Sequence, residues 1–184
     1  MLLLGMLVLG AGLGLFQRLD RQRQLVARIE AAGGRCVYYR YESSGRFETW
    51  LRKRLPRSYF DDVLSIELYK STEKLDGILV SLAELKSLKA VNLDDTQVSD
   101  AGLRYLAELK SLEVVSLNNT QVSDAGLRYL AALKSLECLY LANTHVSDTG
   151  LAHLAELKSL IGLCLQDTQV SDAGLPHLAE LKSL

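Results

Sequence analysis

Hydrophobic residues recur along residues 85–184 with a period of 24. Four units begin at Leu85, Leu109, Leu133 and Leu157. The first unit reads LKSLKAVNLDDTQVSDAGLRYLAE, and the other three are near copies of it. The alternation at its start predicts a short strand, in which Val91 and Leu93 point inward and Asn92 and Asp94 point outward.

The second half of each unit predicts a short helix. In the first unit, Ser99 is a candidate N-cap, and the carboxylate of Asp100 would lie near the positive end of the helix dipole. Leu103, Leu106 and Leu109 give this helix an apolar inner face. One unit alone cannot bury these leucines, whereas stacked units form a continuous core. The pattern therefore predicts an α/β solenoid of repeated strand–helix units.

The spacing of the leucines is typical of one repeat family. A period of 20–29 residues with L-x-x-L-x-L is the signature of leucine-rich repeats. The block T-x-V-S-D-A-G-L-x-x-L resembles bacterial leucine-rich-repeat proteins with 24-residue T-x-V-[ST]-D-x-G-L units, and residues 61–184 carry the resemblance. It implies a curved solenoid with parallel strands on the concave face, short helices on the convex face, and a role in protein interaction without catalytic residues.

The same block is also similar to the cysteine-containing repeats of F-box substrate adaptors. Those repeats are longer and carry cysteine where this chain has Thr96. No F-box-like pattern precedes the array within residues 1–84, which argues against the ubiquitin-adaptor interpretation.

Two polar columns run through the predicted turns. Thr96, Thr120, Thr144 and Thr168 follow the strands, where their hydroxyls could satisfy free backbone groups of the turn. Asp95, Asn119, Asn143 and Asp167 form the second column. We expect its side chains to bond the turn backbone, and a calcium site is the alternative.

The residues before the array predict a small α+β cap. Residues 61–84 resemble a degenerate first repeat, because Ile66, Leu68, Leu79 and Leu82 echo the later units and Thr72 lies 24 residues before Thr96. Residues 17–60 form a basic juxtamembrane segment with eleven Lys/Arg against four Asp/Glu. In it we predict a helix ending near Gly33-Gly34, a strand over 35–41, a turn over 42–45 and a basic helix over 49–55.

Met1–Phe16 is apolar and contains no charged side chain. The favoured interpretation is an N-terminal apolar helix that anchors the protein in a membrane, in a single pass. A signal peptide and a helix buried in the protein itself are the alternatives. The arginines that follow would keep residues 17–184 on the cytoplasmic side.

The residue types and their spacing limit the kinds of chemical site that the chain could hold. The three cysteines lack metal-ligand or disulfide spacing, so we expect free thiols, and no motif indicates a catalytic site, a metal site or a cofactor. Aromatic residues interleaved with arginine in residues 35–60 match no nucleic-acid-binding pattern. His153 and His177 occupy the helix position of Tyr105 and Tyr129, where surface packing explains them.

The copies differ mainly on the outward side of the strands. Residues 96–112 and 120–136 differ at one position, whereas 89–95 and 113–119 share only their two core residues. Variable side chains on a fixed scaffold favour a recognition surface for a protein or peptide ligand, and drift at exposed positions is the alternative. The predicted binding residues are Lys89, Asn92, Asp94, Glu113, Ser116, Asn118, Glu137, Tyr140 and Gln166, flanked by Ala142, Ile161 and Cys164. Tyr140 is the strongest single anchor.

Two further hypotheses remain open. The array ends at Leu181-Lys-Ser-Leu184, where a further strand would begin, so its apolar edge could mediate self-association in a structural array. The chain could also be a fragment of a longer signalling or adaptor protein.

Overall fold

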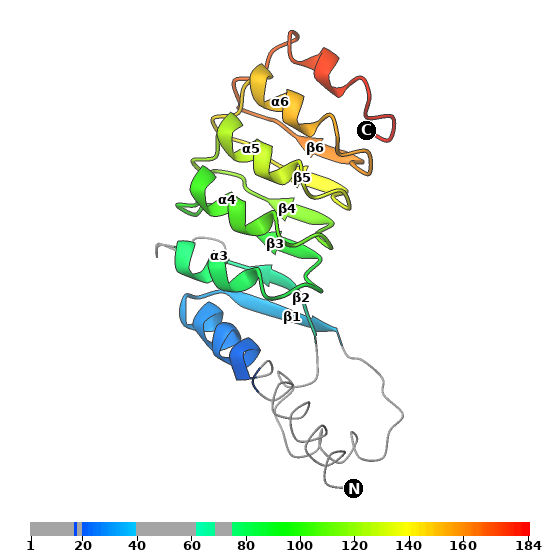
Figure 1. The fold of residues 1–184 in the computed structure, drawn as a ribbon. Helices are drawn as coiled ribbons and strands as arrows, with labels where there is room; N and C mark the ends of the chain where they lie inside the picture. Colours follow the sequence, from blue (N-terminus) through cyan, green and yellow to red (C-terminus); the bar gives the residue numbers. More distant parts are fainter. Residues whose placement is uncertain (1–16, 18–19, 40–61, 69–74) are drawn as a thin grey trace, which may run out of the picture.

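The structure is a computed structural model that describes residue 17 and residues 20–39, 62–68 and 75–184. Its centre is a six-stranded sheet in the order β1 to β6, so that each strand lies beside the next one in sequence (Figure 1). The strands are β1 (Arg35–Tyr39), β2 (Asp62–Glu67), β3 (Ala90–Asn92), β4 (Val114–Ser116), β5 (Cys138–Tyr140) and β6 (Gly162–Cys164). The helices are α3 (Asp76–Leu82), α4 (Asp100–Leu106), α5 (Asp124–Leu130), α6 (Asp148–Leu154) and the 3-10 helix η2 (Leu175–Leu178).

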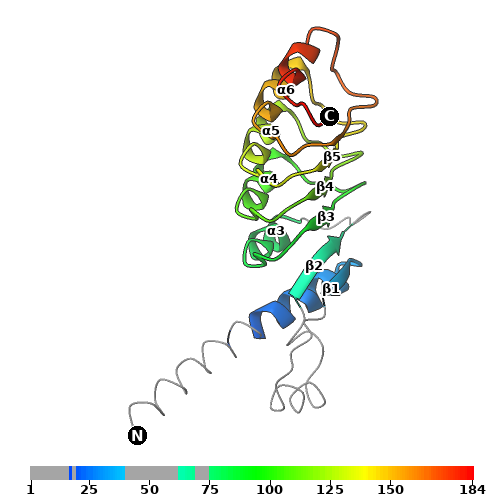
Figure 2. The ribbon, with the colours of Figure 1, turned by 90° about the vertical axis from the view of Figure 1, so that its right-hand side faces the viewer.

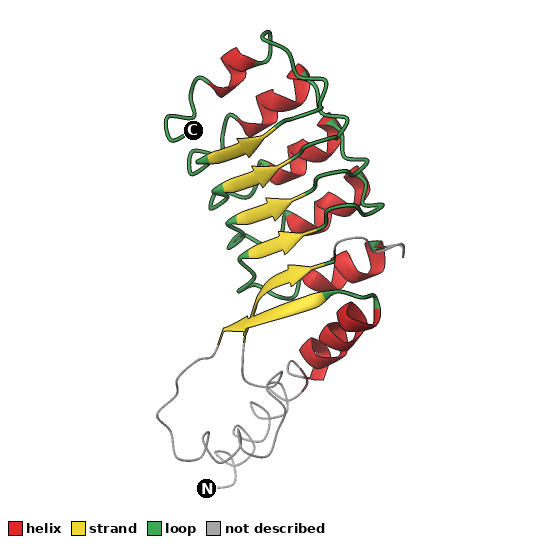
Figure 3. Ribbon diagram, turned by 180° about the vertical axis from the view of Figure 1, so that it is seen from behind, coloured by secondary structure: helices red, strands yellow, loops and turns green. Residues whose placement is uncertain are grey.

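The strands of the array are parallel and in exact repeat register. Val91 pairs with Val115, and each later strand pairs at positions 24 residues further on. β2 also pairs in parallel with β3, but there Ile66 lies opposite Val91, an offset of 25. The strands line one side of the array and the helices line the other (Figures 2 and 3). This arrangement confirms an α/β repeat solenoid.

The core is built from the inward positions that the alternation predicts. Val91 and Leu93 are buried in the first unit, and Leu103, Leu106 and Leu109 are fully buried beneath its helix. The same positions are fully buried in the second and third units. Burying these side chains contributes roughly 1.5–3 kcal/mol each, which offsets the entropy of ordering the short elements.

The T-x-V-S-D-x-G block joins neighbouring units. Asp100 accepts hydrogen bonds from the backbone N of Ser123 at 2.8 Å and from its hydroxyl at 2.6 Å. The same pair of bonds links Asp124 to Ser147 and Asp148 to Ser171. A methyl group on Gly126 would collide with Asp100 and Leu103, so the glycine lets consecutive helices approach.

The serines are the N-caps and the aspartates lie in the first turn of their helices, as predicted. The bonds from the aspartates to the next unit are an additional role that was not predicted. The side chains of Ser123 and Ser147 each accept a bond from the backbone N two residues further on, whereas Ser99 makes no such bond. A pattern read within one unit cannot reveal a bond that crosses to the next.

The helix predicted for the fourth unit is wrong in type. Residues 175–178 form a 3-10 helix instead of the seven-residue α-helix seen in the units before it. Pro176 has no N–H to donate to the carbonyl four residues earlier, so the α-helical ladder cannot form there. Leu163, Leu165 and Leu178 are also only partly buried, because no further unit covers them within residues 1–184.

The other end of the sheet is covered by β1, which pairs antiparallel with β2. A helix over residues 20–31 precedes it and buries Leu25, Val26 and Ile29. The helix ends as predicted, because Gly33 has a φ of 80° and the N–H of Gly34 bonds the carbonyl of Ile29 at 2.8 Å.

Several predicted segments lie outside the described residues: the apolar segment Met1–Phe16, the end of the strand predicted over 35–41, the turn over 42–45, the helix over 49–55 and Thr72. In the part of the chain that is described, no helix has both the length and the apolar character needed to cross a membrane.

Candidate partner-binding face

The outward side of β2 to β5 carries a shallow hollow with a volume of about 330 Å³. We call this side of the sheet the strand face. Five of the nine predicted binding residues line the hollow: Asn92, Asp94, Ser116, Asn118 and Tyr140. The remaining lining residues are Ser65, Glu67, Ala90, Val91 and Val114.

The four other predicted residues are not among those that line the hollow. Lys89 and Glu113 directly precede β3 and β4 and form an ion pair, and both side chains are about 40% exposed (44% and 39%). Glu137 and Gln166 are exposed. Of all nine, Tyr140 offers the largest apolar surface to solvent, with 41% of it exposed.

The carboxylate of Asp94 organises the floor of the hollow. It accepts bonds from the Ser116 hydroxyl at 2.7 Å and from the backbone N and side-chain amide of Asn118 at 2.8 and 3.3 Å. The side-chain oxygen of Asn118 in turn accepts the backbone N–H of Ala142 at 2.8 Å. Ser116 is only 8% exposed as a result. These polar side chains are held in place before any partner arrives.

The threonine column behaves as predicted. Each hydroxyl donates to the carbonyl three residues earlier, at 2.7 Å in all four units. The first three threonines are buried, with 4–5% of their surface exposed.

The neighbouring column differs from the prediction. Asn119 donates to Asp95 and Asn143 donates to Asn119, both at 2.9 Å, so these side chains bond one another along the array rather than the turn backbone. Their φ values of 52–57° place them in the left-handed region, which Asn and Asp tolerate better than most residues. Among the described residues, no three or more His, Cys, Asp or Glu side chains gather in a group that could hold a metal ion.

Sequence reasoning missed Ser65 and Glu67, which reach the hollow from β2. Glu67 is 25% exposed and holds Arg35 of β1 through two hydrogen bonds of 2.9 and 3.1 Å. The signal that could have found it was the echo of Ile66 and Leu68, which places Glu67 outward between two core positions.

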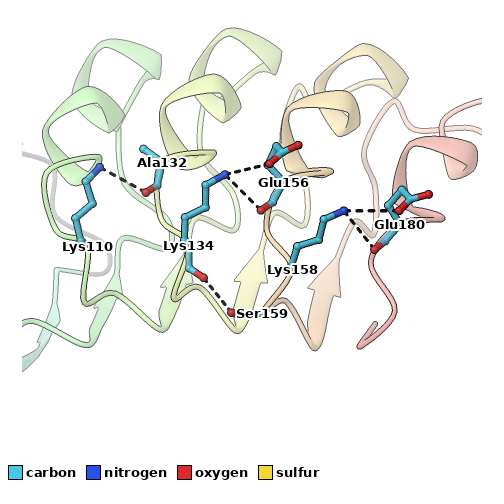
Figure 4. Close-up of polar contacts among 7 residues, drawn as sticks. All are labelled: Lys110, Ala132, Lys134, Glu156, Lys158, Ser159 and Glu180. Carbon is cyan, nitrogen blue, oxygen red and sulfur yellow. Dashed lines mark hydrogen bonds and ion pairs between the residues drawn. The ribbon is translucent and has the colours of Figure 1, made fainter.

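The loops that follow the helices carry lysines (Figure 4). Lys110, Lys134 and Lys158 each donate to the backbone carbonyl 22 residues further on, at 3.4–3.5 Å. Lys134 also lies 3.6 Å from the Glu156 carboxylate and Lys158 lies 3.9 Å from that of Glu180, whereas Lys110 has no such carboxylate because alanine stands at position 132.

Tyr105 and Tyr129 pack partly against the core from the helix side. The guanidinium groups of the preceding arginines lie 4.5 and 4.7 Å from their ring centres. This packing agrees with the structural role predicted for the Tyr/His column.

Residues 84–107 match a family model described as a leucine-rich repeat. The match spans one unit, and near copies of that unit make up the rest of the array. Two solved structures are similar to it. An internalin from Listeria monocytogenes has a TM-score of 0.43 and 20% identity over 67% of this chain and 46% of its own. The plant peptide hormone receptor RGFR1 in complex with RGF2 has a TM-score of 0.38 and 18% identity over 55% of this chain and 16% of its own.

This chain thus spans less than half the length of either structure. No curated protein matches its sequence.

Cys36, Cys138 and Cys164 are free thiols. Cys138 lies opposite Gly162 and Cys164 lies opposite Tyr140, so the two are offset on adjacent strands. Burial, and then the nearby carboxylate of Glu30, raise the pKa of the Cys36 thiol to about 11. Cys36 therefore stays protonated at neutral pH, where a thiol is a poor nucleophile.

Proposed function

We propose that the strand face of this leucine-rich-repeat array binds a protein or peptide partner. The observation that carries the proposal is the hollow itself: five residues chosen from the divergence of the copies line one depression. Its floor is fixed by hydrogen bonds, and exposed Tyr140 stands beside it. Tyrosine is enriched among the residues that dominate binding energy at interfaces.

The helix side is the internal comparison for this proposal. Its residues barely change between copies, and its tyrosines are packed by neighbouring arginines. A binding surface on that side would require partners that recognise a repeated surface. The strand side instead presents a different side chain in every unit, which gives a partner a defined register.

Selection of displayed peptides against the purified chain tests the proposal. The selected peptides should lose at least tenfold in affinity for Tyr140→Ser, which places the serine of the preceding unit at this position. They should keep their affinity for Tyr129→His, which introduces the histidine found in the third unit at the matching helix position. Peptides that ignore Tyr140→Ser and respond to Tyr129→His would reject the strand face.

We propose further that the chain is tethered to a membrane through Met1–Phe16, with 17–60 as a basic segment, 61–84 as a divergent repeat and 85–184 as the array. The uncharged start and the basic residues after it support this proposal. The full chain should remain in carbonate-washed membranes, and a chain lacking residues 1–16 should be released. Release of both would overturn the tether.

The proposed side is the cytoplasm. An impermeant maleimide added to intact cells should then leave Cys138 and Cys164 unlabelled until lysis. Labelling of either thiol before lysis would place the array on the opposite side.

A second candidate function is self-association through the edge formed by the last unit. Leu175 and Leu184 are each at least half exposed there, whereas the equivalent leucines of the preceding unit, Leu151 and Leu160, are buried. Light scattering of the full chain should show oligomers that grow with concentration and that Leu184→Glu weakens. A mass equal to one chain throughout the concentration series would exclude this function.

A further inference from the structure

Charge is unevenly distributed within the hollow. Glu67 is held by Arg35, and Glu113, just outside, is held by Lys89. Within the described residues, no cation lies within ion-pair distance of Asp94, although its carboxylate lines the hollow. Three protein hydrogen bonds orient this carboxylate, and two of them, from the Ser116 hydroxyl and the Asn118 backbone N, fall on the same oxygen, Oδ1.

The second oxygen accepts fewer of these bonds. Oδ2 of Asp94 takes only the longer bond of 3.3 Å from the Asn118 amide. A carboxylate oxygen has room for further donors, and charged donors form the strongest such bonds. Because the protein already holds this carboxylate in place, little further conformational entropy is lost when a cation binds to it.

The aromatic ring that lines the same hollow favours the same kind of ligand. Tyr140 occupies the position of Ser116 in the next strand, and Ser116 bonds directly to Asp94. A planar cation can lie against a tyrosine face while it donates to a carboxylate.

The wider strand face has the matching sign of charge. The nine predicted binding residues include one lysine and three carboxylates: Lys89, Asp94, Glu113 and Glu137. Such a surface attracts a basic partner and repels an acidic one.

We propose that this hollow receives the guanidinium group of an arginine from a basic peptide segment, with Asp94 as its ion-pair partner and Tyr140 as its stacking surface. The inference rests on the proposed function of the strand face and specifies the chemistry of its partner. Arginine fits better than lysine because its planar group can both stack and donate to two acceptors.

The test uses N-acetyl-arginine amide as the probe and N-acetyl-citrulline amide as its uncharged equivalent of the same shape. Nuclear magnetic resonance titration of the full chain should show saturable shifts at the amides of Asn92, Asp94 and Asn118 with arginine. Citrulline should bind at least tenfold more weakly. Equal affinity for the two probes would overturn the inference.

Two matched variants test which carboxylate binds the arginine probe. Asp94→Asn should lower the affinity for the arginine probe at least tenfold. The variant should fold, because asparagine already stands at the equivalent position 118 of the next unit, where its side-chain oxygen accepts the backbone N–H of Ala142. Asp95→Asn removes the same charge from the neighbouring exposed column, where Asn119 is the precedent, and should change affinity less than twofold. Equal losses in both variants would reduce the effect to general attraction and reject the site.

The outcome also separates the two proposals. In one case, selected peptides lose affinity for Tyr140→Ser and yet keep it for Asp94→Asn and after replacement of their own arginines. That result would support the strand face as the binding surface and reject the arginine site. Peptides insensitive to Tyr140→Ser would reject the strand face itself.

Discussion

The threonine column gives the sharpest test of how the array is held together. Thr120 is 4% exposed, and its hydroxyl donates to the carbonyl of Leu117 at 2.7 Å. Leu117 is itself fully buried, so water cannot replace the donor. Thr120→Val keeps the branched shape of the side chain and removes only the hydroxyl.

The magnitude follows from that burial. A buried acceptor left without a donor costs about 1–3 kcal/mol, and the methyl group that replaces the hydroxyl returns about 0.8 kcal/mol at most. We expect Thr120→Val to lower the free energy of unfolding by about 1–2 kcal/mol. Urea denaturation followed by circular dichroism measures the change, with an unaltered dependence on urea concentration showing that the folded state is the same.

Thr168→Val is the matched control. Thr168 makes the same bond, also at 2.7 Å, but it and Leu165 are only half-buried in the last unit. Water can reach this carbonyl, so the loss should stay below about 0.5 kcal/mol. Equal losses at the two positions, or none at Thr120, would refute the argument that burial sets the energy of this column.

Two further predictions concern charges. Ala132→Glu should give Lys110 the carboxylate partner that its later equivalents have, raising the unfolding free energy by about 0.2–1 kcal/mol, and added salt or Ala132→Gln should abolish the gain. The pKa of Asp148 should lie below its ordinary value, because the backbone N–H of Ser171 and then its hydroxyl stabilise the charged carboxylate. In a carbon-13 titration, Ser171→Ala should raise this pKa part of the way back. An ordinary pKa for Asp148 in the wild-type protein would contradict the contact. The stability this contact provides is present above the unfolded-state pKa and is lost as pH falls through the lower folded-state pKa.

The stacking of the array was predictable from the sequence because every unit buries apolar side chains at the same positions. Alternation identified Val91 and Leu93 as inward, and helical spacing identified Leu103 and Leu106, all of which are buried. The threonine bond was equally accessible from sequence, because its partner lies three residues away within the same unit. Local relations of this kind need no knowledge of the neighbouring unit.

The failures share a cause, since each depends on what a residue meets in the next unit or on a change in one copy. Asp100 lies in the first turn of its own helix as predicted, but its hydrogen bonds from Ser123, 23 residues away, were not predicted. Asn119 was assigned to its own turn, but it bonds Asp95, 24 residues away. Pro176 changes one copy of a shared helix, and a consensus taken over four units hides it.

The prediction of the candidate site was also limited by contacts between units that the sequence of one unit does not show. Divergence between copies was taken to mark positions that contact a partner, yet Ser116 and Asn118 differ from their counterparts while both bond Asp94. Their variation therefore reflects packing within the sheet as well as any selection for a ligand. The predicted binding residues whose side chains are exposed are Tyr140 at the hollow and Glu137 and Gln166 outside it. Specificity on this face would thus come from a few open side chains and one oriented carboxylate, while the polar residues between them hold that carboxylate in place.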